Sequence, residues 1–525
     1  MPQALTSFDP FVPDKKLLPF CRGPPSVGDV STPLAAPHQR SLAMNDITRP
    51  LPDDILLALS THLATTMPRL QRLWNYYRNP ATSHTGPARL AQEAGLPSRV
   101  TGNITSPTHD DRVPTRREVV VENDIAWRIH TLVDFMFGKP LAILSTAADE
   151  TRRDLIQQVL ERIFEQSGGI GFLQDIALLG HVYGSIDIVV TVNPAISSAD
   201  ATSDPETMAS FISLELVEPT RAVSLLEPTD YRNLRAFAVH IPSASASSGR
   251  DARSLLERLV NSGRSPSRTK TTGTTRLHTP GSIDTYIDGT LRESAPSLLP
   301  PGQLGIVHIQ NISQPFRHEG LSEVEPLIPL QDELNTRLSD RASRLTMQNF
   351  TMYLAKGLLS QTPLEVGPGA VWFTDNPDAS IQTFGGNSSS EGEDLHISEI
   401  REALDKASSV PPVATGVVKA KIGNLTSANA LRITLMGVLG KTARKRVTYG
   451  RGISELCRII LTTLDHHGAF ATDPLDRGVR LEWPDPLPID PEQTVRTALL
   501  KQDLGVPRPR LLAELGYAPT DPGVQ

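Results

Sequence analysis

The stretch SSVPPVATGVVKAKIGNLTSANALRITLMGVLGKTARKR, residues 408–446, ends one helical pattern and begins another. Pro411 and Pro412 end the first helix, because proline lacks an amide hydrogen and disfavours a helical conformation in the residue before it. A glycine-containing loop that carries Lys419 and Lys421 follows, and the remainder again has helical periodicity. The stretch therefore predicts two helices joined by a loop with two lysines.

The second of these helices is predicted from about residue 427 to 464, and at 1.5 Å per residue it would be about 57 Å long if unbroken. Its glycines predict bends. Glu455 is its only glutamate, so its positive charge is unbalanced. Such a helix either faces solvent or contacts acidic neighbours or phosphates, and the sequence leaves both open. The basic residues singled out here are Arg432, Lys441, Arg444, Lys445 and Arg446.

The whole chain is acidic, with 51 Lys and Arg against 58 Asp and Glu in 525 residues, a net charge of -7. Such a balance excludes a uniformly basic DNA-binding protein, so any contact with nucleic acid requires local basic patches. The length is sufficient for about two to four domains. Two cysteines are too few for a disulfide framework, which suits the cytoplasm. No signal peptide and no membrane-spanning segment is predicted.

Two short motifs suggest chemistry and fail on inspection. GVLGKT, residues 437–442, resembles a phosphate-binding loop, but Leu435 stands where that motif requires glycine. DHH, residues 465–467, has no second cluster at metal-ligand spacing. Neither a G-x-S-x-G nor an H-E-x-x-H motif is present. We therefore expect no catalytic residue, no cofactor and no metal site.

The rest of the chain predicts an α+β fold. Asn123 is placed as the N-cap of a helix that ends at Gly138, and Gly184 as the turn from a helix into an apolar strand. An Asp-Gly turn predicts a hairpin within residues 282–294. Ser322 and Glu325 have capping-box spacing. Further strands are expected within 213–228, 234–241, 303–311, 350–357 and 369–376, and a helix from 393 to 409.

The succession of these motifs resembles tailed-bacteriophage portal proteins. The segments that carry the resemblance are NDIAWRIHTLVDFMFGKP, FLQDIALLGHVYGSIDIVV, GLSEVEPLIPLQDELNTRLSDRASR, VPPVATG with the loop and helix after it, and RLEWPDPLPIDPEQTVRTALLKQDLGVPRPRLLAELGY. Each is weakly specific by itself, and their order from about residue 51 to 520 makes the similarity. A Pro-rich arm before residue 51 and a Ser/Arg insertion near 242–275 depart from the family.

The resemblance implies a ring, usually a dodecamer, with a wing, a two-helix stem, a small β-containing clip, a tunnel loop with a long helix, and a short helical crown. Carried over by position, the parts are an arm (1–50), wing (51–319), first stem helix (320–348), clip (349–392), second stem helix (393–410), tunnel loop (411–427), long helix with the return through the wing (428–480) and crown-like region (481–525). Because each stem helix is amphipathic, we expect neighbouring subunits to cover its apolar stripe.

The resemblance also implies function. The ring would occupy one capsid vertex of the virion and form the channel for packaging and ejection of double-stranded DNA, after assembly in the host cytoplasm. Lys419, Lys421 and Asn424 would lie in the channel, where lysines offer phosphates point charges without recognising bases. The implied partners are DNA, the terminase large subunit, the major capsid and scaffolding proteins, and a tail adaptor, with no membrane.

The clip would be the docking face for the packaging motor and the tail adaptor. Its residues singled out for docking are Trp372, Phe373, Glu391, Glu393 and Asp394, of which the acids would steer a basic surface. Two alternatives stay open. The chain could be another ring-forming virion connector, or a nucleic-acid-processing enzyme that binds through the basic helix.

Overall fold

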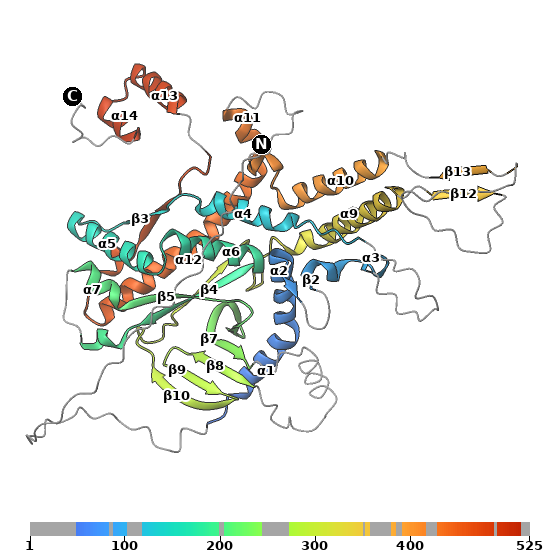
Figure 1. The fold of residues 1–525 in the computed structure, drawn as a ribbon. Coiled ribbons are helices and arrows are strands. Elements are labelled where there is room, and N and C mark those ends of the chain that lie inside the picture. Colours follow the sequence, from blue (N-terminus) through green and yellow to red (C-terminus); the bar gives the residue numbers. More distant parts are fainter. Residues whose placement is uncertain are drawn as a thin grey trace, which may run out of the picture. The chain divides into compact units, whose positions relative to one another are not determined.

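The structure is a computed structural model, and it describes residues 49–82, 88–101, 118–198, 204–243, 272–349, 352–356, 378, 380–384, 391–415, 428–487 and 491–515. The chain divides into two units, Met1–Asp46 and Ile47–Gln525, and the described residues all belong to the second. They form a mixture of helices and antiparallel sheets (Figure 1), as the predicted α+β class requires. The predicted arm lies almost wholly outside the described residues, as does most of the predicted insertion.

The first helices run almost without interruption. Helix α1 (Asp53–Thr61) continues through a π-helical turn (His62–Thr66) into α2 (Met67–Arg78). Asn79, in the left-handed conformation with φ of 46°, ends α2. Short elements follow: β1 (Ala81–Thr82), β2 (Arg89–Leu90), the 3₁₀ turn η2 (Ala91–Gly95) and α3 (Ser98–Thr101).

Three helices with local start and stop signals form the centre of the fold. Helix α4 (Asp124–Phe137) is capped by Asn123, whose side chain accepts a hydrogen bond from the amide of Ala126, and this confirms the predicted cap. Helix α5 (Glu150–Gln166) is capped in the same way by Asp149. Helix α6 (Ile170–Tyr183) ends at Gly184, and β4 (Ser185–Val192) begins at once, as predicted.

Gly184 is required by both its conformation and its neighbour. Its φ is +97°, a region that side chains with a Cβ rarely adopt, and a Cβ there would lie 2.6 Å from the carbonyl oxygen of Gly320. The turn after α6 therefore packs directly on the backbone that leads into the first stem helix.

Two antiparallel sheets follow. In the first, β4 lies between β5 (Ile212–Val217) and β11 (Ile306–Gln310). The second has the order β10-β9-β8-β7-β6, and its strands are β6 (Ala222–Glu227), β7 (Asp230–Pro242), β8 (Gly273–His278), β9 (Ser282–Ile287) and β10 (Thr290–Pro296). A 3₁₀ turn, η3 (Pro194–Ser198), and α7 (Pro205–Ser210) connect β4 to β5.

Two connections of the second sheet were predicted from the sequence. Asp288 and Gly289 both have positive φ, which confirms the predicted Asp-Gly hairpin between β9 and β10. Strands β7 and β8 pair as far as Pro242 and Gly273, so the Ser/Arg insertion connects two neighbouring strands. Strand β8 begins at Gly273, within the last three residues of the stretch near 242–275.

The two helices predicted to form the stem, called the stem helices from here on, pack together and are joined through a hairpin (Figure 1). A 3₁₀ turn, η5 (Glu325–Leu327), leads into α9 (Ile328–Asn349), and α10 (Glu391–Ser408) returns. Between them, β12 (Met352–Lys356) confirms the first predicted clip strand. The predicted second strand, 369–376, lies outside the described residues, and the strand that pairs with β12 is β13 (Ser380–Phe384), which the sequence analysis did not predict.

The long helix is divided. After the 3₁₀ turn η6 (Pro412–Thr415), α11 (Ala428–Thr434) and α12 (Met436–His466) are separated at Leu435. The predicted helix of about 57 Å is therefore not a single one. Helix α12 continues through all four of its glycines, and at Gly452 a Cβ would lie 2.4 Å from the Ile309 side chain. This glycine permits close packing of α12 on β11.

The C-terminal part pairs with an earlier strand in a separate two-stranded sheet. A 3₁₀ turn, η7 (Pro474–Arg477), precedes β14 (Val479–Glu482), which pairs with β3 (Ala142–Ser145) across the predicted boundary at residue 480. Helices α13 (Pro491–Asp503) and α14 (Arg508–Glu514) follow. Among the described residues, none of the helices has the length and apolarity needed to cross a membrane.

The main apolar core lies between the first sheet and the helices that cover it. Its members include fully buried side chains of α4, α6, β4 and α12, such as Phe137, Ile176, Ile186 and Leu456. A second core joins α2, α4 and the two stem helices. The stem is therefore attached to the rest of the chain by buried apolar surface as well as by the polar contacts described next.

Candidate functional site: the stem and its junction with the long helix

The apolar faces of the stem helices are covered within one chain. Leu334 of α9 is fully buried, and so is Leu404 of α10; both belong to the core that also contains Leu73 of α2 and Ile129 of α4. The expectation that neighbouring subunits must cover these stripes is therefore wrong for this part of the stem. Two amphipathic helices that pack on each other and on α2 and α4 need no further partner there.

A stripe of polar side chains on α9 binds an extended segment of backbone. Gln331, Asn335 and Ser339 lie four residues apart, so they share one face of the helix. They accept hydrogen bonds from the backbone amides of Asp124, Glu122 and Val120, at 3.1, 2.9 and 2.9 Å. All three side chains are buried. Every fourth residue of α9 thus meets every second amide of residues 120–124. These hydrogen bonds hold α9 against that segment.

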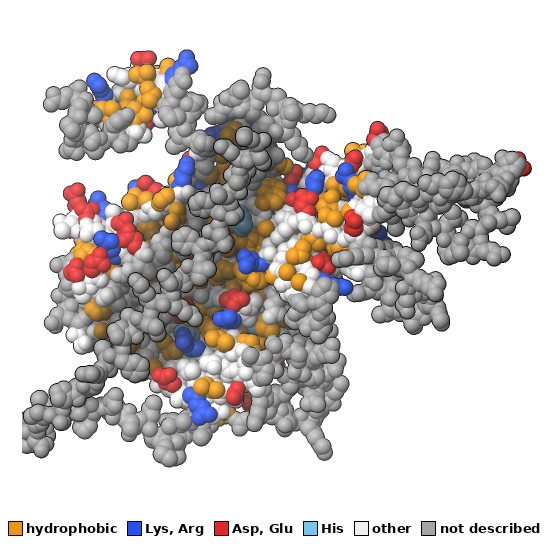
Figure 2. Space-filling model, in the orientation of Figure 1, with side chains coloured by type: hydrophobic (Ala, Val, Ile, Leu, Met, Phe, Trp, Pro, Cys, Tyr) orange, Lys and Arg blue, Asp and Glu red, His pale blue; other side chains and the backbone are white. Residues whose placement is uncertain are grey.

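Ion pairs cross between the stem helices. Arg341 lies 2.8 Å from Asp394, and Arg344 pairs with Glu393. Glu393 and Asp394 thus lie in the first turn of α10, where carboxylates also complement the helix dipole. Glu393 and Asp394, named among the docking residues of the clip, therefore belong to the helix predicted from 393 to 409; Glu391, in the same turn, is exposed. Figure 2 shows acidic and basic side chains interspersed over the stem on the face drawn.

The entry to the stem uses half of the predicted capping box. Ser322 Oγ accepts hydrogen bonds from the amides of Val324 and Glu325, at 3.1 and 3.3 Å. The carboxylate of Glu325 does not return to the cap, because it binds Arg69 of α2 with both oxygens, at 2.9 and 2.7 Å. The second half of the box is replaced by an ion pair between α2 and the stem.

A buried ion cluster joins the stem entry to the long helix. One oxygen of Glu323 lies 2.8 Å from Nζ of Lys441, and the other lies 2.8 Å from Nζ of Lys445. The second contact is an ion pair whose angles are not those of a hydrogen bond. Lys441 also donates to the carbonyl of Ser408 at the end of α10, at 2.7 Å. The cluster therefore connects both the segment before α9 and the end of α10 to α12.

Burial and charge act in opposite directions within this cluster. Burial would raise the pKa of Glu323, but Lys445 and Lys441 outweigh it and lower that pKa to about 2. Burial lowers the pKa of Lys445 to about 8 in spite of Glu323. Next to them, burial and the charge of Lys445 hold the pKa of His181 well below its usual value. One carboxylate therefore serves two buried ammonium groups beside a neutral histidine.

Most of the predicted basic-helix residues are engaged inside the chain. Lys441 and Lys445 contact Glu323, as described. Arg432 lies 2.5 Å from Asp485, and Arg446 donates to the carbonyl of Pro484 at 2.8 Å. The sequence left open whether these basic residues face solvent or contact acidic neighbours or phosphates. Four of them contact carboxylates or backbone carbonyls of the same chain. Arg444 is exposed and borders a groove of about 940 Å³ that Arg317 and Arg451 also line.

Five of the predicted site residues lie outside the described residues. They are Lys419, Lys421 and Asn424 of the tunnel loop and Trp372 and Phe373 of the clip. The structure describes the chain up to Thr415 and again from Ala428. The roles assigned to these residues stay predictions.

One buried carboxylate and one buried or half-buried cluster of polar residues were not predicted from the sequence. One is the partner of the lysines, Glu323, and the other is a cluster of Asp187, His308 and His318, which among the described residues forms a group able to hold a metal ion. Both had a signal. Asp187 and His308 stand within apolar strands, SIDIVV and GIVHIQ, where a polar side chain requires a partner.

Comparison with known proteins finds a family match for part of the chain. Residues 289–516, which include the stem, the β12–β13 hairpin and the long helix, match a family model of phage portal proteins. The particular family is described as "Phage portal protein, SPP1 Gp6-like". Over these residues, which are a little under half of the chain, the match confirms the resemblance drawn from the sequence.

Solved structures give weaker likenesses. Chains from "Virion of native gene transfer agent (GTA) particle" and "Neck of native GTA particle computed with C12 symmetry" are each 14% identical, with a TM-score of 0.40, over 75% of this chain and 89% of theirs. A chain from "Neck of empty GTA particle computed with C6 symmetry" has a TM-score of 0.41 at the same identity, over 75% and 90%. No curated protein sequence matches the chain.

Proposed function

We propose that the chain is the subunit of a phage-type portal, a ring at one capsid vertex through which double-stranded DNA enters during packaging and leaves during ejection. The observation that carries the proposal is the match of residues 289–516 to phage portal proteins. It covers the part of the chain in which two packed stem helices, a hairpin and a long helix follow one another.

The proposed parts follow the observed elements. In this proposal, helices α9 and α10 form the stem, the segment with β12 and β13 forms the clip, and residues 411–427 form the tunnel loop of the channel. The part before the stem, with its two sheets, forms the wing. In this arrangement the buried ion cluster fixes the stem to the long helix of the same subunit, so that the stem and the loop keep their positions while DNA moves past.

The proposed role is structural and not enzymatic, as it is for phage portal proteins as a class. Energy for packaging would come from the terminase large subunit, which would dock on the clip, and a tail adaptor would replace it later. Capsid and scaffolding proteins would contact the wing. The proposed site is the virion vertex, after assembly in the host cytoplasm.

The ion pairs between the stem helices change which acidic residue is proposed to dock the motor. Glu393 and Asp394 are engaged with Arg344 and Arg341, so their charge is largely compensated within the stem. Glu391 is exposed at the clip end of α10 and remains the acid best placed to meet a basic surface of the motor. Trp372 and Phe373 keep their proposed docking roles.

The test is the assembly state of the purified chain. Twelve chains of 57.1 kDa would form a ring of about 685 kDa. Mass photometry at micromolar concentration, followed by electron microscopy, should show a closed ring with a central hole. Only monomers or dimers at every concentration, under conditions that keep the chain folded, would contradict the proposal.

A further inference from the structure

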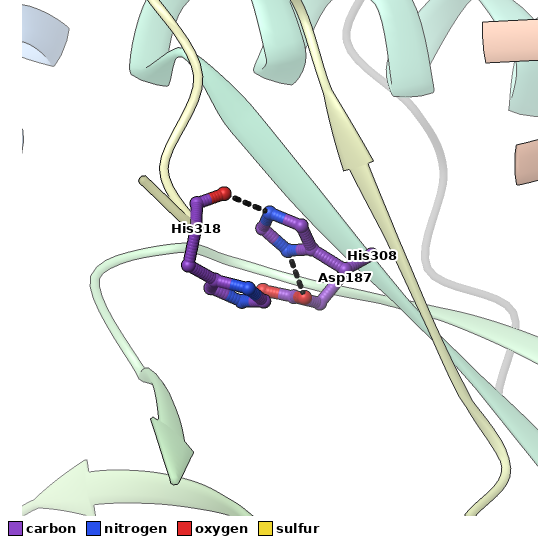
Figure 3. A group of neighbouring side chains, drawn as sticks. All are labelled: Asp187, His308 and His318. Atoms are coloured by element: carbon purple, nitrogen blue, oxygen red, sulfur yellow. Dashed lines mark hydrogen bonds and ion pairs between the residues drawn. The ribbon is translucent and has the colours of Figure 1, made fainter. Parts of the chain in front are cut away.

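Three polar side chains converge where the first sheet meets the loop that leads to the stem (Figure 3). Asp187 of β4 and His308 of β11 are directly opposite each other in the strand register. His318 lies in the loop after β11, and its ring stacks on that of His308 with centroids 3.8 Å apart and planes 20° apart. One potential ligand atom from each of the three lies within 4.8 Å of the other two.

Both nitrogens of His308 face oxygen acceptors. Nε2 lies 2.9 Å from the backbone carbonyl of His318, and Nδ1 lies 2.7 Å from the carboxylate of Asp187. A neutral imidazole has one N–H, so it satisfies only one of these oxygens. If Nε2–H donates to the carbonyl, Nδ1 presents a lone pair towards a carboxylate that is itself buried. A cation at this position, either a proton or a metal ion, resolves the conflict.

The surroundings of His318 favour a metal ion over a proton. Its Nε2 is buried and has no hydrogen-bond partner in the part of the chain that the structure describes. A proton shared by Asp187 and His308 leaves this nitrogen without a partner, which costs free energy in the interior. A metal ion that accepts lone pairs from both histidines and from the carboxylate uses all three groups.

We propose that Asp187, His308 and His318 bind one divalent transition-metal ion, with zinc as the best match. Two imidazoles and a carboxylate are a ligand set that zinc takes, with bonds of about 2.0–2.2 Å, and a water completes the tetrahedron. The ligand atoms lie within 4.8 Å of one another, and the stacked rings of His308 and His318 must turn out of their parallel arrangement for a nitrogen of each to point at the ion. The hydrogen bond from Nε2 of His308 to a backbone carbonyl is the outer contact that orients a histidine for ligation through Nδ1.

The position of the site supports entry of the ion and gives it a role. A hollow of about 530 Å³ borders all three residues, together with Tyr183 and Glu319, and opens to solvent. The ion would tie β4 and β11 to the loop that reaches Gly320, two residues before the stem cap. It would act as a cross-link between the sheet and the entry to the stem, and this role does not depend on the proposed function.

The test uses the full untagged chain, stripped of metal with a chelator and then supplied with Zn²⁺. After desalting, elemental analysis should find one zinc per chain, and the thermal midpoint should rise by a few degrees, because an ion that binds only the folded state stabilises it. Replacing zinc with Co²⁺ should give visible absorption bands of a tetrahedral site with nitrogen and oxygen ligands.

Two variants and one control locate the site. Asp187→Asn and His318→Ala should each weaken zinc binding by at least about tenfold. Equal thermal midpoints of these variants and the wild type without metal would show that they fold. His396→Ala removes an exposed histidine of α10 and should leave the stoichiometry and affinity unchanged. The absence of stoichiometric zinc in the wild type, or equal affinity in both site variants and the wild type, would overturn the proposal.

Discussion

Glu323→Gln removes the carboxylate that Lys441 and Lys445 share and leaves two ammonium groups in the interior. The side chains of Lys445 and Glu323 are 0% and 5% exposed, so water does not replace the lost partner. Removing one partner of a buried pair costs about 3–5 kcal/mol. The lowering of the pKa of Glu323 from 4.5 to about 2 corresponds to about 3 kcal/mol, which is in the same range.

Lys445→Met should have a very different effect, although it removes a member of the same cluster. Burial lowers the pKa of Lys445 to about 8, which means that its charged form is less stable here than in water. After the substitution, Glu323 keeps Lys441 at 2.8 Å. The main cost of breaking a buried pair is the uncompensated charge that is left behind, and here the carboxylate of Glu323 stays paired. We therefore expect a change within about 1 kcal/mol, in either direction.

Hydrogen exchange measured by mass spectrometry is the suitable assay, because it reports local opening at the junction. A loss of about 3 kcal/mol in Glu323→Gln corresponds to roughly 100-fold faster exchange in peptides that cover residues 320–330 and 436–450. Glu455→Gln is the matched control, since its partner Arg458 and Glu455 itself are about half exposed and such pairs contribute about 0.2–1 kcal/mol. Equal exchange in both glutamine variants, or an equal loss in Lys445→Met, would refute the reasoning.

The same carboxylate predicts a dependence on pH. Because the pKa of Glu323 is lower in the folded chain than its usual 4.5, its contribution is complete above about pH 5 and is lost as the pH falls towards 2. Protection of the junction should decline in this interval more steeply in the wild type than in Glu323→Gln. Parallel pH profiles for the two proteins would contradict the assignment.

Three further predictions concern other positions. Gly184→Ala should destabilise the chain by at least about 1–3 kcal/mol, because the φ is +97° and the Cβ would contact backbone; an unchanged thermal midpoint would contradict this. Glu393→Lys should weaken stem protection in hydrogen exchange, and Arg344→Glu added to it should restore most of the loss, since the two pair across the helices; a double variant no better than the single one would exclude the pair. Lys419→Ala with Lys421→Ala should preserve ring assembly and reduce packaged DNA, so normal particle yield and DNA length would count against a channel role.

Local signals in the sequence were enough for many elements of this fold. Asn123 caps α4, and Asp288 with Gly289 turns the β9–β10 hairpin, because each position is decided by a short-range hydrogen bond or by backbone conformation. Gly184 marks the change from helix to strand for the same reason. The two stem helices and the first strand between them also follow from residues a few positions apart, whereas the second strand, β13, was not predicted.

Tertiary structure alone decided which partners the polar residues meet. Nothing near Glu323 in the sequence indicates Lys441 and Lys445, which are more than a hundred residues away, and the apolar stripe of α9 does not say whether α10 or another subunit covers it. The same holds for Asp187, His308 and His318, which come from two paired strands and a loop. Long-range contacts of this kind depend on strand register and helix packing, and these are set by the burial of whole faces and not by the local preferences of the chain.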